Sequence, residues 1–120
     1  MPVEADAFKQ HLSQASEITI SVTGRKSGRT ISNPIWFVVE GDTLYLLPVK
    51  GSDTQWYQNV LKNPAMRIQV GGAETEATVT PLTDAKQVSA VVERFRQKYG
   101  PGDVKKYYSK FDVGVVAQLD

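Results

Sequence analysis

A short cationic turn is the part of this sequence whose residue types are best suited to binding a ligand. Residues 23–29, Thr-Gly-Arg-Lys-Ser-Gly-Arg, contain three cations and no acid. Glycine permits backbone conformations that bring N–H groups close to an anion, and a serine hydroxyl is a further donor. Arginine binds phosphate oxygens through paired hydrogen bonds, and lysine adds a point charge. The turn is therefore a candidate anion site formed by Arg25, Lys26, Ser27, Gly28 and Arg29.

A charged hairpin tip that serves only solubility is the alternative interpretation of this turn. Its spacing is not that of a Walker A loop, which needs a longer interval between glycine and lysine. It is not that of a dinucleotide fingerprint either. The kind of anion therefore has to be inferred from the rest of the chain.

The remaining side chains offer little reactive machinery of their own. His11 is the only histidine, and the chain has no cysteine. A Ser-His-Asp triad, a Cys-His pair and a zinc site are therefore not expected, and no metal site is predicted. We interpret His11 as a solvated residue of a surface helix, and Glu74 and Glu76 as charges on an exposed strand face. A catalytic function would accordingly depend on a bound cofactor.

A second group of residues has the chemistry to contact a flat ring system. Lys50-Gly51-Ser52 precedes Trp56, and Lys50 is expected where a strand ends at the mouth of a barrel, a usual place for ligand entry. A ring could pack beside Trp56 or Trp36, with Lys50 reaching its polar edge. For Trp56 we favour the alternative, in which the indole anchors a short helix to the barrel.

A third group combines three tyrosines near the C-terminus with interleaved lysines. Tyr99, Tyr107 and Tyr108 are typical of a substrate pocket or a nucleic-acid surface, and equally of the buried edge of a last helix. The formal net charge of the whole chain is only +1. This balance argues against a dedicated nucleic-acid binder, so small molecules are the expected partners.

The elements that must position these residues follow from the hydrophobic pattern. A chain of 120 residues with 41% hydrophobic residues is expected to form one domain, residues 1–120, with a core that needs no disulfides. Alternation predicts six strands, at residues 17–23, 31–40, 43–49, 66–70, 74–81 and 113–119. Because they occur as antiparallel pairs, a mainly β (α+β) fold is expected, with a closed or half-closed antiparallel barrel.

Helices are expected at the start, middle and end of the chain. Residues 5–16 have helical spacing of apolar residues, and Ser52 or Asp53 is expected to cap a short helix that ends at Leu61. Asp84 is expected to cap a strongly amphipathic helix, and residues 104–110 one or two further turns. We expect no signal peptide in residues 1–14 and no apolar run long enough to span a bilayer. The expected compartment is the cytoplasm.

In this order, these stretches resemble the deazaflavin (F420)-dependent nitroreductase family, which has the split β-barrel fold also found in pyridoxamine-phosphate oxidases. The resemblance extends over nearly the whole chain, from about Ile18 onward. Besides the cationic turn, it rests on Asn33-Pro34 before an aromatic strand, on Leu46-Leu47-Pro48-Val49-Lys50-Gly51, and on Trp56-Tyr57 followed by Asn59-Val60-Leu61-Lys62-Asn63-Pro64. It implies a six-stranded split barrel with flanking helices.

The resemblance also implies an activity and a set of binding residues. The activity is an F420H2-dependent oxidoreductase that transfers a hydride from the reduced coenzyme to a quinone, enone or nitro compound. Arg25 and Lys26 would bind the phosphate and acidic tail of the coenzyme, and Lys50 and Gly51 would lie against its ring system. Further coenzyme contacts are implied for Ser27, Gly28, Arg29, Asn33, Pro34, Trp36, Val49 and Trp56. Tyr99, Tyr107 and Tyr108 would shape the substrate side, and a homodimer is implied.

The sequence also departs from the pattern of this family. Ile31 occupies a position where members often have arginine, so Arg29 would have to substitute for it. Trp36 stands where tyrosine is common.

Two alternatives stay open: a split-barrel oxidoreductase that binds flavin mononucleotide (FMN), whose phosphate also suits the basic turn, and a non-catalytic protein that binds a coenzyme or lipid-like ligand. The proton donor stays open between a tyrosine and water.

Overall fold

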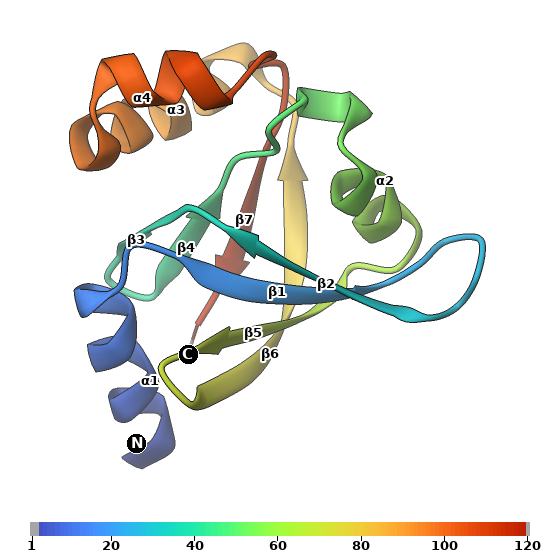
Figure 1. Cartoon of the computed structure of the whole chain (residues 1–120), viewed down its shortest axis with the longest axis vertical. Helices are drawn as coiled ribbons and strands as arrows, with labels where there is room; N and C mark the ends of the chain where they lie inside the picture. The colour runs from blue at the N-terminus through green and yellow to red at the C-terminus, as the bar shows by residue number, and fades with distance from the viewer. Residues whose placement is uncertain (1–2, 120) are drawn as a thin grey trace.

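Seven antiparallel strands curl into a half-closed barrel with helices packed around it in the computed structural model, which describes residues 3–119 (Figure 1). The strands are β1 Ile18–Thr23, β2 Thr30–Ile35, β3 Phe37–Glu40, β4 Thr43–Leu46, β5 Ala65–Val70, β6 Ala73–Leu82 and β7 Gly114–Gln118. The helices are α1 Val3–Gln14, α2 Gln55–Lys62, α3 Ala85–Tyr99 and α4 Pro101–Tyr107, with a short 3-10 turn η1 at Gly51–Asp53. The mainly β split barrel with flanking helices is thus confirmed.

The strand count differs from the expected six because the predicted strand at 31–40 is two strands. The sheet order is β2-β1-β5-β6-β7-β4-β3, so β2 and β3 form its two edges although only Trp36 separates them in sequence. β2 pairs with β1, whereas β3 pairs with β4. A straight strand cannot reach both edges of a curled sheet, so the chain bends at Trp36. The prediction of one continuous strand over residues 31–40 is therefore wrong.

The barrel interior is filled by the side chains of alternate residues along the strands, which face inward. In β1, Ile18, Ile20 and Val22 are buried and pack with Phe37 and Ile68 in the main core. This burial follows from the period of two along a strand. The interior is apolar, so the barrel core itself is a packed scaffold that fixes the strand ends and the connections between them.

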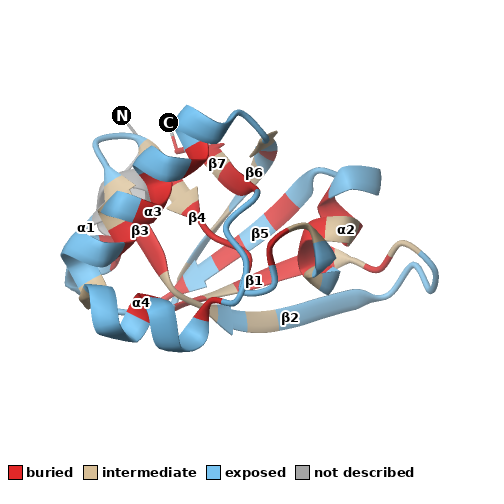
Figure 2. Cartoon of the chain, turned by 90° about the horizontal axis from the view of Figure 1, so that it is seen from above, coloured by how far each residue is buried: buried red, intermediate tan, exposed pale blue. Residues whose placement is uncertain are grey.

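A second core lies between the C-terminal helices and the outer face of the β3–β4 hairpin. The buried face of α3 consists of Val88, Val91, Val92 and Phe95, as the apolar pattern predicts. Asp84 caps this helix as expected, since its carboxylate accepts a hydrogen bond of 3.1 Å from the N–H of Gln87. α3 and α4 are thereby fixed against the barrel (Figure 2).

Around Lys50 the structure corrects two expectations. β4 ends at Leu46, so Lys50 lies beyond the strand rather than at its end. The helix α2 begins at Gln55 after Thr54, and neither Ser52 nor Asp53 caps it. Ser52 instead forms a hydrogen bond with Asp112, and Asp53 forms an ion pair with Lys110.

Candidate functional site

The cationic turn is the connection between β1 and β2, and it extends away from the barrel beside α2 (Figure 1). Two backbone hydrogen bonds close it: Gly24 N–H donates to the Arg29 carbonyl at 2.8 Å, and Gly28 N–H to the Gly24 carbonyl at 2.9 Å. Gly28 has φ of 72°, a conformation that favours glycine. The Ser27 hydroxyl accepts from Arg29 N–H at 3.2 Å. The turn is therefore a defined loop.

This closure changes how the turn can hold an anion. The backbone N–H groups of Gly24, Arg25, Gly28 and Arg29 are all hydrogen-bonded within the chain. They do not form the open backbone cradle that the glycines suggested. The groups of this turn that remain available for an anion therefore include the cationic side chains of Lys26 and Arg29.

Arg25 is held against α2 by two uncharged side chains. Its Nη1 lies 2.8 Å from Asn59 Oδ1 and its Nη2 lies 3.0 Å from Gln55 Oε1. The backbone N–H of Arg25 donates to the same Asn59 oxygen at 3.2 Å. Among the described side chains (residue 8 and residues 10–119), none forms an ion pair with the exposed side chains of Lys26 and Arg29. The loop thus presents cations whose charge no described carboxylate offsets.

The turn that carries Lys50 is tied to both its neighbours. Lys50 N–H donates to Thr54 Oγ1 at 2.8 Å, which connects it to the start of α2. On the other side, Ser109 N–H donates to the Val49 carbonyl at 2.9 Å. Val49 is 40% exposed. The turn therefore offers an apolar contact next to a lysine.

Asp112 clamps the next residues of this turn. Its carboxylate accepts from Ser52 N–H at 2.9 Å and from the Ser52 hydroxyl at 2.6 Å. The hydroxyl hydrogen bond lowers the pKa of Asp112, so the carboxylate stays ionised at neutral pH. Gly51 has φ of 55° and lies so close to Asp112 and Lys110 that a Cβ atom would clash with both. Only glycine fits this position without a shift.

The predicted tyrosines come together with Trp36 where β2 meets β3. Trp36 stacks on Tyr99 with ring centroids 4.2 Å apart and planes 7° apart. Tyr107 meets the indole edge-on at 5.3 Å, and Tyr108 lies at 6.0 Å. Tyr108 is only 5% exposed, whereas Tyr107 is 52% exposed. Tyr108 therefore forms a buried edge of the C-terminal helices, whereas Tyr107 remains at the surface.

The Phe37 backbone is the meeting point of two polar side chains from the end of α3. The Tyr99 hydroxyl accepts from Phe37 N–H at 3.0 Å and lies 2.8 Å from the carbonyl oxygens of both Phe37 and Ser16. Lys98 Nζ donates to the Phe37 carbonyl at 2.8 Å and lies 3.6 Å from the Phe37 ring centre. Burial raises the pKa of Tyr99 to about 12 and lowers that of Lys98 to about 8.

Burial also raises the pKa of Tyr108, so Tyr99 and Tyr108 both stay protonated at neutral pH. The hydroxyl proton of Tyr99 is shared between two backbone carbonyls, so this hydroxyl helps to hold the backbone at Phe37 and Ser16. Tyr107 is the tyrosine of this group with the most exposed side chain.

Lys98 provides a prediction for the pH dependence of stability. Since its pKa falls from 10.5 to about 8 on folding, the unfolded chain binds more protons at this residue between these pH values. The free energy of unfolding should therefore rise with pH in this window, whereas below about pH 8 the cost of the charged form is fully present. Lys98→Gln should remove the rise, as measured by urea unfolding midpoints at several pH values.

The matched control for this measurement is Lys86→Gln, which removes an exposed lysine from the first turn of the same helix. That variant should keep the pH dependence of the parent protein. Identical slopes for Lys98→Gln and the parent would contradict the partly desolvated ammonium described above.

The remaining residues that the sequence singled out lie in the core, on the edge strand β2 or at the exposed surface. Trp56 is 5% exposed and packs in the main core, which confirms its interpretation as the anchor of α2. Asn33 and Pro34 lie on the edge strand β2, where Asn33 pairs with Ile20 and Pro34 with Thr19. His11 is exposed, as expected. Glu74 and Glu76 are also exposed and pair with Arg67, which confirms their role as surface charges.

Sequence reasoning missed three residues that the structure brings to these clusters. They are Gln55, Asn59 and Asp112. Gln55 and Asn59 are four residues apart and so share one face of α2, a pattern that the sequence does contain. Their partner Arg25 lies 30 and 34 residues earlier in the chain. No local pattern marks Asp112. Lys98, one of the lysines interleaved with the tyrosines, contacts the Phe37 backbone.

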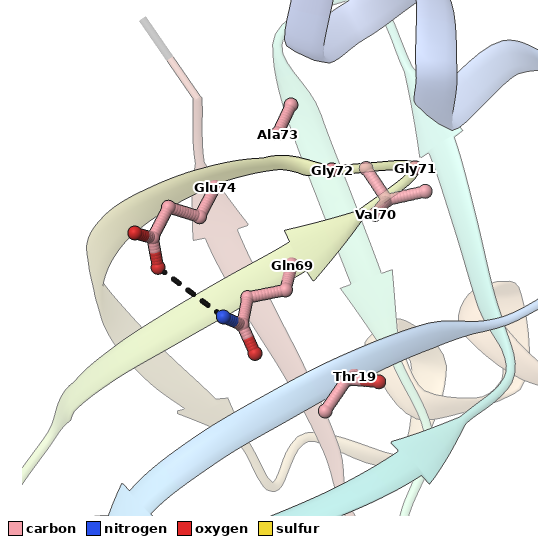
Figure 3. Close-up of a pocket in the computed structure, with 7 residues that line it drawn as sticks. All are labelled: Thr19, Gln69, Val70, Gly71, Gly72, Ala73 and Glu74. Carbon is pink, nitrogen blue, oxygen red and sulfur yellow. Dashed lines mark hydrogen bonds between the residues drawn. The ribbon is translucent and has the colours of Figure 1, made fainter.

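A separate hollow lies at the β5–β6 turn (Figure 3). It is lined by Thr19, Gln69, Val70, Gly71, Gly72, Ala73 and Glu74. Gln69 donates to Glu74 at 3.3 Å across it. None of the predicted binding residues lines this hollow, so it is distinct from the surface formed by the turn, α2 and the Lys50 segment.

Among the side chains that the structure describes, at residue 8 and residues 10–119, no group of histidine, cysteine or acidic residues is arranged to hold a metal ion. None of the helices within residues 3–119 combines the length and the hydropathy of a membrane-crossing helix.

Comparison with known proteins gives a family and a fold. Residues 9–112 match the family model described as "Uncharacterized protein conserved in bacteria (DUF2255)". An F420-H2 dependent reductase, FDR-A, has a similar structure with a TM-score of 0.67 and 21% identity over 86% of this chain and 94% of that one. At this identity the likeness establishes the fold.

Two further solved structures show how varied the proteins with this fold are. A protein from Listeria innocua, described as a candidate pyridoxamine 5'-phosphate oxidase, aligns with a TM-score of 0.69 and 16% identity over 96% of this chain and 91% of that one. HutZ, a heme storage protein from Vibrio cholerae, aligns with a TM-score of 0.70 and 13% identity over 96% of this chain and 89% of that one. The fold is thus compatible with oxidation chemistry and with ligand storage.

Proposed function

We propose that this chain, which belongs to the DUF2255 family of bacterial proteins and has a split-barrel fold, is an oxidoreductase that uses the deazaflavin coenzyme F420. The observation that carries this proposal is the loop of cations without carboxylate partners, held beside α2. An anionic tail is the kind of ligand that such a loop accommodates.

The residues proposed to bind the coenzyme are connected by a series of direct contacts. Arg25 contacts α2, the start of α2 contacts Lys50, and Val49 contacts Ser109. Ser109 follows directly on the tyrosines that pack around Trp36. This continuity supports one extended site, with an anionic end at the loop and an apolar, aromatic end at Val49 and Tyr107.

The chemistry of these residues fits the groups that F420 carries. Arg25, Lys26 and Arg29 would bind its phosphate and acidic tail through charge-assisted hydrogen bonds. Val49, Lys50 and Gly51 would lie against its ring system, and Trp36 and Tyr107 would face the acceptor. When bound in its reduced form, F420 supplies a hydride to an electrophilic acceptor such as a quinone, enone or nitro compound. The protein binds, orients and shields the reactants.

Titration with oxidised F420 and with FMN, followed by fluorescence, tests the coenzyme assignment. We expect F420 to bind more tightly, because its acidic tail can engage the cations of the loop in addition to its phosphate. Turnover of F420H2 with a quinone or nitro acceptor then tests the reaction. Tighter binding of FMN would reject F420 and favour an FMN-dependent oxidoreductase of the same fold.

A non-catalytic binding protein is the alternative from another class. The structural likeness to a heme storage protein supports it, as does the structural task of Tyr99. Tight binding of F420H2 without oxidation by any quinone, enone or nitro acceptor would favour this alternative. A homodimer stays a prediction from the family resemblance, and a cytoplasmic location stays a prediction from the sequence.

A further inference from the structure

The partners of Arg25 differ in kind from those of other arginines in this protein. Arg67 pairs with Glu74 and Glu76, Arg94 with Glu40, and Arg96 with Glu93. The guanidinium of Arg25 instead donates to the amide oxygens of Asn59 and Gln55. Its position is therefore fixed by hydrogen bonds that leave its charge unneutralised.

The geometry of these contacts leaves Arg25 able to bind a ligand. A guanidinium has five N–H donors, and the two amides engage two of them. Asn59 is only 3% exposed, so it forms a fixed support at the base of the loop. It also accepts the backbone N–H of Arg25 at 3.2 Å, which ties the chain and the side chain to one oxygen atom.

We infer that Asn59 and Gln55 are positioning residues that hold Arg25 in place as an uncompensated cation and so determine the affinity of the loop for phosphate-bearing ligands. This inference rests on the proposed function for the identity of the coenzyme. An amide orients the guanidinium without competing with an incoming anion. A carboxylate in the same place would orient it equally well and would also neutralise it.

The test replaces each amide by the carboxylate of nearly the same shape. Asn59→Asp and Gln55→Glu keep an oxygen acceptor beside Arg25 while adding one negative charge. Each variant should bind oxidised F420 about tenfold to a hundredfold more weakly, since charge-assisted contacts are worth roughly 1.5–3 kcal/mol. Gln55 is exposed, so Gln55→Glu should fold normally even if the buried Asn59→Asp does not.

Gln97→Glu is the matched control. It makes the same chemical change at an exposed position of α3, a helix that lies on the opposite side of the molecule from the loop (Figure 1). It should leave the affinity for F420 unchanged. An equal loss of affinity in this control would show that net charge alone is responsible and would overturn the inference.

A second measurement uses inorganic phosphate and needs no coenzyme. Phosphate should shift the side-chain NMR signal of Arg25 in the parent protein, and Gln55→Glu should reduce this response. If Arg25→Ala weakens F420 binding but the two carboxylate variants bind like the parent, the positioning role is wrong and the coenzyme site stands. If Arg25→Ala leaves F420 binding unchanged, the proposed site is wrong, and the absence of a phosphate response at Arg25 would then also overturn the positioning role.

Discussion

Replacing Arg25 and Lys26 together with alanine is expected to weaken F420 binding by about 3 kcal/mol or more, because each charge-assisted contact contributes roughly 1.5–3 kcal/mol. This corresponds to a dissociation constant more than about a hundredfold higher. The expected loss of affinity is large because the Arg25 guanidinium contacts amide oxygens rather than carboxylates, so its positive charge is available to the ligand. Fluorescence titration at fixed ionic strength measures the change.

The control for this variant is Lys86→Ala with Lys105→Ala, which removes the same charge from exposed positions on α3 and α4. It should bind F420 nearly as the parent does. An unchanged dissociation constant in the Arg25 and Lys26 variant would refute the loop as the anion site and would return it to the status of a charged hairpin tip.

Replacing Trp56 with alanine is expected to lower the free energy of unfolding by about 3–5 kcal/mol, the usual cost of deleting a large buried aromatic side chain. The indole is 5% exposed and joins α2 to the barrel core. A decrease of this size is a large part of the total free energy of unfolding of a domain of this size. Urea unfolding followed by circular dichroism measures the change.

Trp56→Phe distinguishes anchoring from ligand contact. The smaller phenylalanine ring should retain most of the packing. F420 should therefore bind to the Trp56→Phe variant with the affinity of the parent protein, and the absorbance spectrum of the bound F420 should be unchanged. A changed spectrum of bound F420 in this stable variant would instead mean that the indole meets the coenzyme ring.

The sequence predicts local structure well where a single face of an element decides it. The cap at Asp84 and the buried face of α3 were both predictable, because apolar residues at helical spacing have one way to be buried together. The location of the cationic turn between two strands was predictable for the same reason, since Ile18, Ile20 and Val22 alternate up to its first residue.

Contacts between distant segments were not predictable in this way. Residues 31–40 read as one strand because β-branched and aromatic residues continue through Trp36, and only the pairing partners reveal the break. Ser52 has the right residue type for a helix cap, but Asp112, 60 residues later, engages it instead. The support of Arg25 by α2 likewise depends on the tertiary fold.

The bend at Trp36 also constrains how the length of this chain can vary. β2 and β3 are consecutive, yet each is fixed in register against a different neighbour, at opposite edges of the sheet. An inserted or deleted residue within 30–40 would turn the side chains of one strand to its opposite face, because strand register has a period of two. The adjoining loop at 24–29 pairs with no strand, so a change in its length would leave the register of β2 and β3 in place. The sheet therefore constrains the length of the segment at 30–40 more tightly than the length of the proposed ligand-binding loop directly before it.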